Sequence, residues 1–308
     1  MYSRQSGHYE GDPSAGMRLP EVAWAGVQGE LARGDMEQDP IVVPVEVEVH
    51  GLEKAKANQK VGEIMGRTKI EWCDEVYNGV TGCTNISPGC KNCYAKKMAY
   101  RLRGRCGYDM INPFKPTLHM DKIEKLSDLD DGPPKRIFVS SMGDLFHDAV
   151  PDEWIDRVLG AARNSRPNEL TKHTFMVLTK RPERMLKWCV RNTTRGFLPY
   201  PNFWIGVTAE NQEMADRRIP VLKGIPAAVR WVSVEPMLEA VDLERWLADG
   251  TLDWVVVGPE TGTGKRPCEN GWIWNLYHQC HKYKVPFFDK RKIWKPLAHQ
   301  FPTTKEEW

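Results

Sequence analysis

The sequence lacks several features that would place it in a familiar class of protein. It contains no run of about 18 apolar residues, and its N-terminus has no basic segment followed by an apolar one, so we expect neither a membrane span nor a signal peptide. Its 43 basic and 41 acidic residues give a formal net charge of +2, which excludes polyanion binding over the whole surface but allows a local basic patch. We therefore expect a cytoplasmic protein without membrane contacts.

Two common catalytic patterns are also missing. No serine with a suitably spaced histidine stands out as a nucleophile and its base, which disfavours a hydrolase or transferase of that kind but keeps it as a third option. The segment Gly262-Thr263-Gly264-Lys265 lacks the four-residue gap and the following Ser or Thr of a phosphate-binding loop. We therefore reject nucleotide binding by such a loop.

The chain divides into two parts of different composition. Residues 1–66 are rich in Gly, Ser, Pro and charge without a sustained hydrophobic period, and they predict a largely irregular N-terminal extension. Residues 67–308 hold most of the apolar runs and predict one folded domain. With 308 residues, 41% of them hydrophobic, the chain is long enough to bury a sizeable core.

Short apolar runs alternate with segments of helical period along the second part. Repeated strand-then-helix order predicts an α/β fold with a parallel sheet and right-handed crossovers. About six or seven strands are too few for a closed eight-stranded barrel and fit a partial (β/α) barrel. We expect strands at 75–80, 136–140, 174–178, 203–207, 229–234, 254–257 and 285–288, and helices at 92–102, 151–164, 182–195, 211–222, 243–250 and 271–284.

Polar residues follow the predicted strands at six places. Because the carboxyl ends of parallel strands meet at one edge of a sheet, we expect these residues to surround a common mouth. The segments are Ser140 to Asp144, Thr179 to Arg181, Thr208 to Asn211, Glu235 to Pro236, Gly258 to Gly262, and Asp289 to Lys290.

Three closely spaced cysteines, Cys83, Cys90 and Cys93, follow the first predicted strand. In a reducing cytoplasm a cysteine cluster is more typical of a metal site than of disulfides. A structural zinc needs a fourth ligand, for which Cys73 and Cys106 are candidates, whereas the nearest downstream histidine, His119, is farther away in the sequence. A [4Fe-4S] cluster on three thiolates instead leaves one iron open to bind S-adenosylmethionine, and the parallel sheet favours this second interpretation.

The motifs around these cysteines resemble a known family. The stretches Thr68 to Trp72, Val80 to Cys83, Ser87 to Cys90 and Asn92 to Ala95 are similar to a three-cysteine family of phages and prophages, of unknown function and related to radical S-adenosylmethionine enzymes. The resemblance extends to Trp294. It implies a partial (β/α) barrel, a [4Fe-4S] cluster and S-adenosylmethionine, and an enzyme that generates a 5′-deoxyadenosyl radical. Its further stretches include Ser141 to Phe146, Leu178 to Pro182, Trp204 to Asn211, Arg217 to Pro220, Ser233 to Pro236 and Val256 to Gly262.

The resemblance also implies roles for single residues. Cys83, Cys90 and Cys93 would hold the cluster, and the backbone at Tyr94 would lie against the adenine. The S-adenosylmethionine contacts would come from Ser141, Asp144, Thr179, Lys180 and Arg181, with Ser141 and Asp144 on the ribose or the amine and the other three on the carboxylate or a substrate phosphate. The residues left for ribose hydroxyls and the substrate are Glu210, Asn211, Glu235 and Glu260.

The substrate and partners follow less directly. We expect a small molecule, with a nucleobase or nucleotide preferred because aromatic residues lie near the strand ends, although tryptophan on a strand more often belongs to the core. The radical chemistry also implies a reductant protein. The alternative is a zinc-stabilised module that binds nucleic acid or protein, with nucleic acid contacted through a basic run after the cysteines. The aromatic residues are Trp72, Tyr77, Trp204, Trp231 and Trp254, and the basic run is Lys91, Lys96, Lys97, Arg101, Arg103 and Arg105.

Overall fold

The computed structural model describes residues 66–126, 133–166, 169–193, 201–291 and 299–302. Its centre is one sheet of eight strands, whose order matches their order along the chain. The strands are β1 (Gly66–Arg67), β2 (Glu75–Tyr77), β5 (Arg136–Val139), β8 (Thr174–Thr179), β9 (Phe203–Thr208), β10 (Val229–Val234), β11 (Trp254–Val257) and β12 (Phe287–Asp289).

The seven strands from β2 to β12 pair in parallel, and β1 runs antiparallel to β2. The fold is therefore an α/β half-barrel with seven parallel strands, which confirms the predicted fold class. β12 begins at Phe287, two residues later than predicted, because Pro286 has no N–H to donate to the sheet.

The predicted first strand is wrong in one respect, because the chain divides it into two short strands. β2 joins the main sheet, whereas β3 (Val80–Thr81) pairs antiparallel with β4 (Thr117–Leu118) in a separate two-stranded sheet. Asn78 lies at the break, and its side-chain oxygen accepts hydrogen bonds from Ser141 Oγ and Met142 N at 3.2 and 3.0 Å. A third small sheet consists of β6 (Asn164–Arg166) and β7 (Glu169–Leu170), so Asn164 is in a strand and not in the helix predicted over 151–164.

The remaining predicted helices are present, with ends that differ by a few residues. Asn211 begins one of them, because its side-chain oxygen accepts a hydrogen bond from Met214 N at 3.0 Å. Residues 194 and 195 of a predicted helix lie outside the described residues. The helices are α2 (Tyr94–Leu102), α3 (Met120–Leu126), α4 (Asp152–Arg163), α5 (Pro182–Thr193), α6 (Gln212–Lys223), α7 (Glu244–Ala248) and α8 (Asn270–Lys282), with a short 3-10 helix, η1 (Pro88–Cys90).

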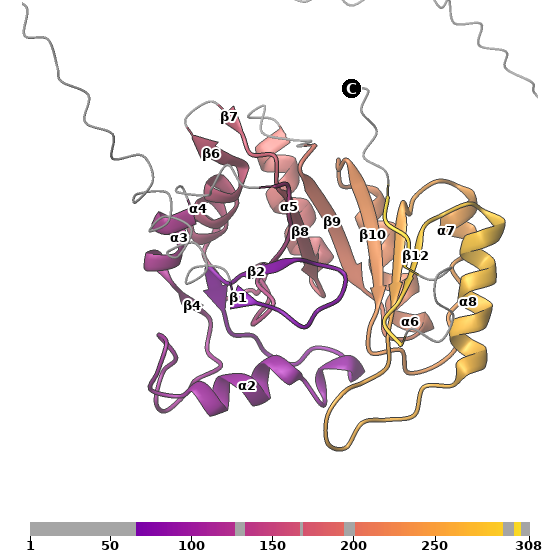
Figure 1. The fold of residues 1–308 in the computed structure, drawn as a ribbon, viewed down its shortest axis with the longest axis horizontal. Coiled ribbons are helices and arrows are strands. Elements are labelled where there is room, and N and C mark those ends of the chain that lie inside the picture. Colours follow the sequence, from indigo (N-terminus) through magenta and orange to yellow (C-terminus); the bar gives the residue numbers. More distant parts are fainter. Residues whose placement is uncertain (1–65, 127–132, 167–168, 194–200, 292–298, 303–308) are drawn as a thin grey trace, which may run out of the picture. The chain divides into compact units, whose positions relative to one another are not determined.

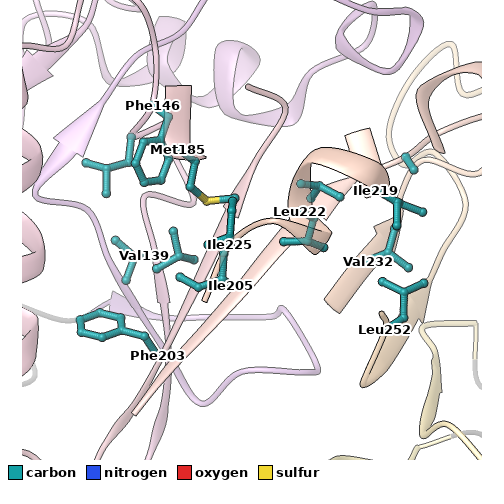
Figure 2. Close-up of a cluster of buried hydrophobic side chains, with 14 of the residues drawn as sticks. Val139, Phe146, Met185, Phe203, Ile205, Ile219, Leu222, Ile225, Val232 and Leu252 are labelled. Atoms are coloured by element: carbon teal, nitrogen blue, oxygen red, sulfur yellow. The ribbon is translucent and has the colours of Figure 1, made fainter. Parts of the chain in front are cut away.

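The larger part of the core lies between the sheet and the helices from α4 to α8. Side chains alternate along each strand, so that Phe175 and Val177 of β8 face this layer while Met176 faces the opposite side. Figure 2 shows the layer where Met185 of α5 and Leu222 of α6 approach the strands. Figure 1 shows α8 along the β12 side of the sheet, and α2 on the lower side of the molecule, apart from α4 and α5.

The opposite face of the sheet, which we call the inner face, carries a second and smaller core. Four tryptophans dominate it, and each is at most 3% exposed. The rings of Trp231 and Trp254 lie 5.3 Å apart, and Trp72 packs edge-on against both. The fourth, Trp204, lies 5.8 Å from Trp254. These rings fill the inside of the half-barrel, and Trp72 also lines the cavity described below.

Two further sequence predictions concern membrane-spanning helices and the N-terminal extension. Within the described part of the chain, no helix is long and apolar enough to cross a membrane. The predicted N-terminal extension lies outside the described residues except for Gly66, so the division at residues 66 and 67 stays a prediction.

Candidate functional site

A cavity of about 220 Å³ lies at the carboxyl ends of the parallel strands. All six predicted strand ends contribute to its wall, together with Cys83, Cys90 and Cys93. The expectation of a common mouth is therefore confirmed. One lining residue from each strand end is Ser141, Lys180, Thr208, Glu235, Glu260 and Lys290.

The cysteines lie on the segment between β3 and α2, residues 82–93, which we call the cysteine loop. Gly82 begins it with a φ of 90°, and a Cβ there would lie 2.1 Å from the carbonyl oxygen of Lys115, so only glycine fits. Gly82 N donates to Met142 O at 3.0 Å, and Asp144 N donates to Gly82 O at 3.3 Å. The loop is thus joined to the end of β5 where it starts.

The second and third cysteines are separated by a single turn of backbone. Cys90 N donates to Ser87 O at 3.0 Å, and Cys93 N donates to Cys90 O at 3.3 Å. Cys93 then lies at the N-terminus of α2. The partial positive charge at a helix N-terminus favours a negatively charged group there, such as a thiolate bound to a metal.

Arg181 holds the beginning of the cysteine loop. Its Nη1 donates to Cys83 Sγ at 3.4 Å and to Asp144 Oδ2 at 3.1 Å, and its Nη2 donates to the Thr84 carbonyl at 3.2 Å. Thr84 Oγ1 lies 2.8 Å from Nε2 of His147, a buried histidine that packs against the loop. Burial and the charge of Asp144 raise the pKa of Cys83 to about 11, and Arg181 opposes that rise.

Glu210 holds the middle of the loop. This fully buried carboxylate accepts a hydrogen bond from Gly89 N at 2.9 Å and pairs with Arg218 Nη1 at 2.8 Å. A Cβ on Gly89 would lie 2.9 Å from Glu210 Cδ, so glycine allows this close approach. Burial disfavours the charged carboxylate, but the charges of Lys180 and Arg218 prevail and lower the pKa of Glu210. The loop is therefore fixed immediately before Cys90.

Glu260 holds the end of the loop. Its Oε2 accepts hydrogen bonds from Asn92 Nδ2 at 2.8 Å and from Arg266 Nε at 2.9 Å, and its Oε1 pairs with Arg266 Nη2. Asn92 Nδ2 also donates to Gly264 O at 2.9 Å. Hydrogen bonds from Arg266 lower the pKa of Glu260 to about 2, so the carboxylate is charged at neutral pH. The loop is thereby fixed immediately before Cys93.

Each cysteine thus has an anchor that comes from a different strand end. Arg181 follows β8, Glu210 follows β9 and Glu260 follows β11. The sequence predicted these three residues as contacts of cofactor or substrate, and the structure gives their charged atoms partners on the cysteine loop. Those binding roles stay predictions, but holding the loop is a role that sequence analysis did not assign.

Glu235 differs from Glu210 and Glu260. Its hydrogen-bond and ion-pair partners among the described residues lie outside the cysteine loop. Its Oε1 pairs with Lys290 Nζ at 2.6 Å, and its Oε2 accepts hydrogen bonds from Trp72 Nε1 at 3.3 Å and Ser233 Oγ at 3.1 Å. Although burial favours the neutral amine, Glu235 raises the pKa of Lys290 above its ordinary value. The pair places one fixed carboxylate and one ammonium in the cavity wall.

Tyr94 and Ser141 meet at the wall of the cavity. Tyr94 OH donates to Ser141 O at 2.6 Å, and Ser141 Oγ donates to Asn78 Oδ1 at 3.2 Å. The preceding residue, Ser140, is buried and has a φ of 59°, which is uncommon for a residue other than glycine. Its hydroxyl has no hydrogen-bond partner among the described residues. An unpaired buried hydroxyl on a strained backbone is a frequent feature of binding sites.

Asp144 is a hub between two strand ends. Its Oδ1 accepts hydrogen bonds from Thr179 Oγ1 at 2.6 Å and Phe146 N at 3.0 Å, and its Oδ2 accepts them from Lys180 N at 3.2 Å and from Arg181. Four donors occupy the four lone-pair positions of a carboxylate. Asp144 therefore orients Arg181 and joins the end of β5 to the end of β8.

Asn211 is the one predicted substrate residue whose side chain serves a helix. It caps α6, and within the described part of the chain it is not among the residues that line the cavity. Substrate binding by Asn211 stays a prediction.

The aromatic residues expected near the mouth are mainly core residues. Tyr77, Trp204, Trp231 and Trp254 are buried and do not line the cavity, so they are core residues, as is usual for tryptophan on a strand. Trp72 does line the cavity, where its indole N–H is bonded to Glu235.

The two candidates for a fourth zinc ligand, Cys73 and Cys106, and the nearest downstream histidine, His119, lie outside the cavity lining. Cys73 is buried in the inner-face core, Cys106 is exposed, and His119 donates to or accepts from Thr81 Oγ1 at 2.8 Å. None of them lines the cavity, and no three His, Cys, Asp or Glu residues in the described ranges are grouped to hold a single metal ion. A tetrahedral zinc would need its sulfurs within roughly 4 Å of each other, since each Zn–S bond is about 2.3 Å.

Sequence reasoning missed the partners of the anchors. Asn92 and Arg218 lie in stretches that carry the family resemblance, so their identity was visible but their contacts were not. Arg266 and Lys290 come from other parts of the chain, and only the topology of the sheet brings them to Glu260 and Glu235.

Comparison with known proteins adds a family and no activity. No curated protein and no solved structure matches the chain. Residues 67–305 match the family described as protein of unknown function (DUF5131), and the chain therefore belongs to this family.

Proposed function

We propose that this protein is a radical S-adenosylmethionine enzyme whose [4Fe-4S] cluster is bound by Cys83, Cys90 and Cys93. The observation that carries the proposal is the convergence of these three cysteines on one cavity at the carboxyl ends of a parallel half-barrel. The resemblance to a three-cysteine phage and prophage family that is related to radical S-adenosylmethionine enzymes also supports the proposal.

The donor set fits such a cluster better than a single zinc ion. Three thiols line the cavity, and Cys73, Cys106 and His119 do not. Three thiolates on a four-iron cluster would leave one iron available for a further ligand. Thiolates of a four-iron cluster bind different irons and stand farther apart than those of one zinc. When bound, such a cluster would pass one electron from a reductant protein to S-adenosylmethionine, which would break a C–S bond to give methionine and a 5′-deoxyadenosyl radical that abstracts hydrogen from the substrate.

The protein's contribution is to fix the cysteines and to bind the rest of the cofactor. Arg181, Glu210 and Glu260 hold the loop, and the Arg181 hydrogen bond to Cys83 favours its thiolate. For S-adenosylmethionine we propose the cavity groups of Tyr94, Ser141, Thr179 and Lys180, joined by the unpaired Ser140 hydroxyl. All five of these residues line the cavity.

For the substrate we propose the part of the cavity where Glu235 and Lys290 form a half-buried ion pair beside Trp72. A fixed carboxylate and an ammonium next to an indole suit a small polar molecule such as a nucleotide. Radical chemistry needs a reductant protein as electron donor. We also propose that the protein acts in the cytoplasm.

The test is metal analysis combined with product detection. Anaerobically reconstituted protein should contain about four irons and absorb broadly near 400 nm, and it should release 5′-deoxyadenosine from S-adenosylmethionine under a strong reductant. Cys83→Ala, Cys90→Ala and Cys93→Ala should each lose the absorption and the product. Cys106→Ala is the matched control, because Cys106 is exposed and lies outside the cavity lining, and it should retain both.

Two results would overturn the proposal. One is stoichiometric zinc with no reconstituted cluster, which would favour the structural module. The other is a cluster that survives all three single cysteine replacements, since that would place it on other residues.

A further inference from the structure

The segment that follows the cysteines carries an unusual concentration of positive charge. Residues 82–116 hold seven Lys and Arg residues against one acidic residue, Asp109, which is paired with Lys115 at 2.5 Å. The whole chain is nearly neutral, so this charge is local. No ion pair with another described residue neutralises the other six, which are Lys91, Lys96, Lys97, Arg101, Arg103 and Arg105.

The same segment exposes most of the large apolar side chains of the described surface. Six of the eight exposed large hydrophobic residues lie between positions 86 and 111. Tyr100 is 48% exposed, and Ile111 is 93% exposed. Exposed apolar groups of this size, gathered in one place, mark an interaction site more often than chance exposure does. The six are Ile86, Tyr94, Met98, Tyr100, Met110 and Ile111.

Helix α2 arranges the two kinds of side chain in stripes. Residues four apart share a face, and the pair Ala95 and Ala99 is the buried stripe. Around the rest of the helix, Lys97 and Arg101 form a cationic stripe. Tyr94 and Met98 lie on one side of this stripe, and Lys96 and Tyr100 lie on the other side.

We infer that α2 and the segment after it, residues 91–111, bind a single-stranded nucleic acid. Cations interleaved with exposed aromatic rings suit a strand whose phosphates pair with Lys and Arg while its unstacked bases lie on the rings. A protein partner is disfavoured because interface cores are depleted of lysine. An anionic membrane is disfavoured because a membrane-surface helix segregates its apolar face from its charges.

The surface is continuous with the cavity. Tyr94 is 51% exposed and also lines the cavity, where its hydroxyl donates to Ser141 O. Lys97 Nζ donates to Thr263 O at 3.2 Å, so the helix contacts the loop after β11 that forms part of the rim. A strand along α2 would therefore bring a nucleotide to the mouth. Its service as the substrate rests on the proposed function, whereas binding itself does not.

Binding is tested by fluorescence anisotropy of a labelled 20-nucleotide single strand of mixed sequence, titrated with the full chain at 50 to 200 mM KCl. Affinity should fall steeply with salt. DNA and RNA strands should bind alike, because the contacts involve phosphates and base faces that both possess. A duplex of the same sequence should bind more weakly.

Variants locate the surface. Lys96→Gln/Arg101→Gln should weaken binding about tenfold at 100 mM KCl and reduce the magnitude of the log–log salt slope by about 1.4, since each phosphate contact on a single strand contributes about 0.7. Tyr100→Ala should weaken binding at least about fivefold, and Tyr100→Phe should bind like the wild type. The control Lys223→Gln/Lys282→Gln changes the net charge equally on α6 and α8 and should have no such effect.

Several results would overturn the inference. These are no oligonucleotide binding, equal weakening by both double variants, a duplex bound as tightly as the single strand, or binding to anionic phosphatidylserine vesicles in place of oligonucleotide. The outcome is distinguishable from that of the proposed function. Oligonucleotide binding without 5′-deoxyadenosine formation would support the nucleic-acid surface and contradict the proposed radical chemistry. Formation of 5′-deoxyadenosine without oligonucleotide binding would support the radical chemistry and contradict the nucleic-acid surface.

Discussion

Charged residues at the strand ends are mainly engaged with one another and with the cysteine loop. Glu210 and Arg218 are both almost completely buried, so removal of either would leave an unpaired charge in the interior. Breaking such a pair costs about 3–5 kcal/mol of stability. The buried pair fixes the cysteine loop, because Glu210 accepts the hydrogen bond from Gly89 N next to Cys90.

Glu260 offers a test of the anchors through pH. Its pKa lies at about 2 in the folded protein against an ordinary 4.5, because Arg266 stabilises the charged form. The stabilisation is therefore complete above about pH 4.5 and is lost as the pH falls from 4.5 toward 2. We predict that Arg266→Gln lowers the free energy of unfolding by about 1–3 kcal/mol at pH 6 and by much less near pH 2.5, since each pKa unit corresponds to about 1.4 kcal/mol and the hydrogen bonds from Asn92 and from the backbone N–H of residue 266 are retained. Urea unfolding at both pH values measures the difference.

The matched control for that experiment is Arg217→Gln. Arg217 is exposed and lies 3.7 Å from Glu183, a surface pair that contributes at most about 1 kcal/mol. It should show a small difference with little dependence on pH. An Arg266 variant that is equally destabilised at pH 6 and pH 2.5 would mean that Arg266 acts through packing and not through the charge of Glu260.

Among the elements, β9 shows how the inner-face core depends on one glycine. Gly206 pairs with Leu178 on one side and Trp231 on the other. A Cβ at this position would lie 2.5 Å from Cε2 of the Trp231 indole, so the absence of a side chain gives the ring its place. Trp231 Nε1 then donates to Trp204 O at 3.3 Å. The strand therefore has a packing reason for a residue that disfavours strands.

Two glycine replacements should have opposite effects. Gly206→Ala forces the Trp231 ring or the backbone to move, and we predict a loss of about 1–3 kcal/mol. Gly160→Ala lies on the exposed side of α4 with nothing within 4 Å, and we predict a gain of about 0.5–1 kcal/mol because alanine favours a helix. Thermal and urea unfolding of the two variants measure both signs. Destabilisation by Gly160→Ala would show that exposed glycines in this protein are not simple helix breakers.

The elements also show what the sequence can predict. The long strands and helices, such as β10 and α5, were predictable because their apolar residues recur with a clear period. Pairs of two-residue strands such as β3 with β4 were not, because they form only where the tertiary structure brings the segments together. The split after Tyr77 depends on Asn78 bonding to the end of β5, a contact that no local pattern reveals.

The same distinction applies to the site. Its location was predictable, since parallel strands end at one edge and the cysteines follow the first of them. The hydrogen-bond partners were not predictable from the sequence. Glu210 meets Gly89 and Glu260 meets Asn92 only because of the positions of β9 and β11 in the sheet. Residue type alone made both glutamates resemble ligand-binding groups.

At the scale of the whole molecule, the inner-face aromatic cluster joins segments that are far apart in the sequence. Trp254 is its centre, with ring contacts to Trp72, Trp204, Trp231 and Phe301 at 5.3 to 6.4 Å. Trp72 precedes the first parallel strand, and Phe301 belongs to the last described segment. Trp72 also donates to Glu235, so the cluster supports the wall of the cavity as well as the half-barrel.

This arrangement predicts that the described fold unfolds as one cooperative unit. Trp254→Leu removes the central ring from a close-packed core, and we expect a loss of about 3–5 kcal/mol, as for other large core truncations. The inner-face core contains residues from the strands β5 to β12 of the main sheet. The tryptophan fluorescence transition and the far-ultraviolet circular dichroism transition should therefore shift together to lower urea concentration. Trp274→Leu on α8, 44% exposed, is the control and should shift neither by more than about 1 kcal/mol. If Trp254→Leu moved the fluorescence transition alone, the inner-face core would be an independent unit, and the cysteine loop and its anchors on β8, β9 and β11 would not rely on it.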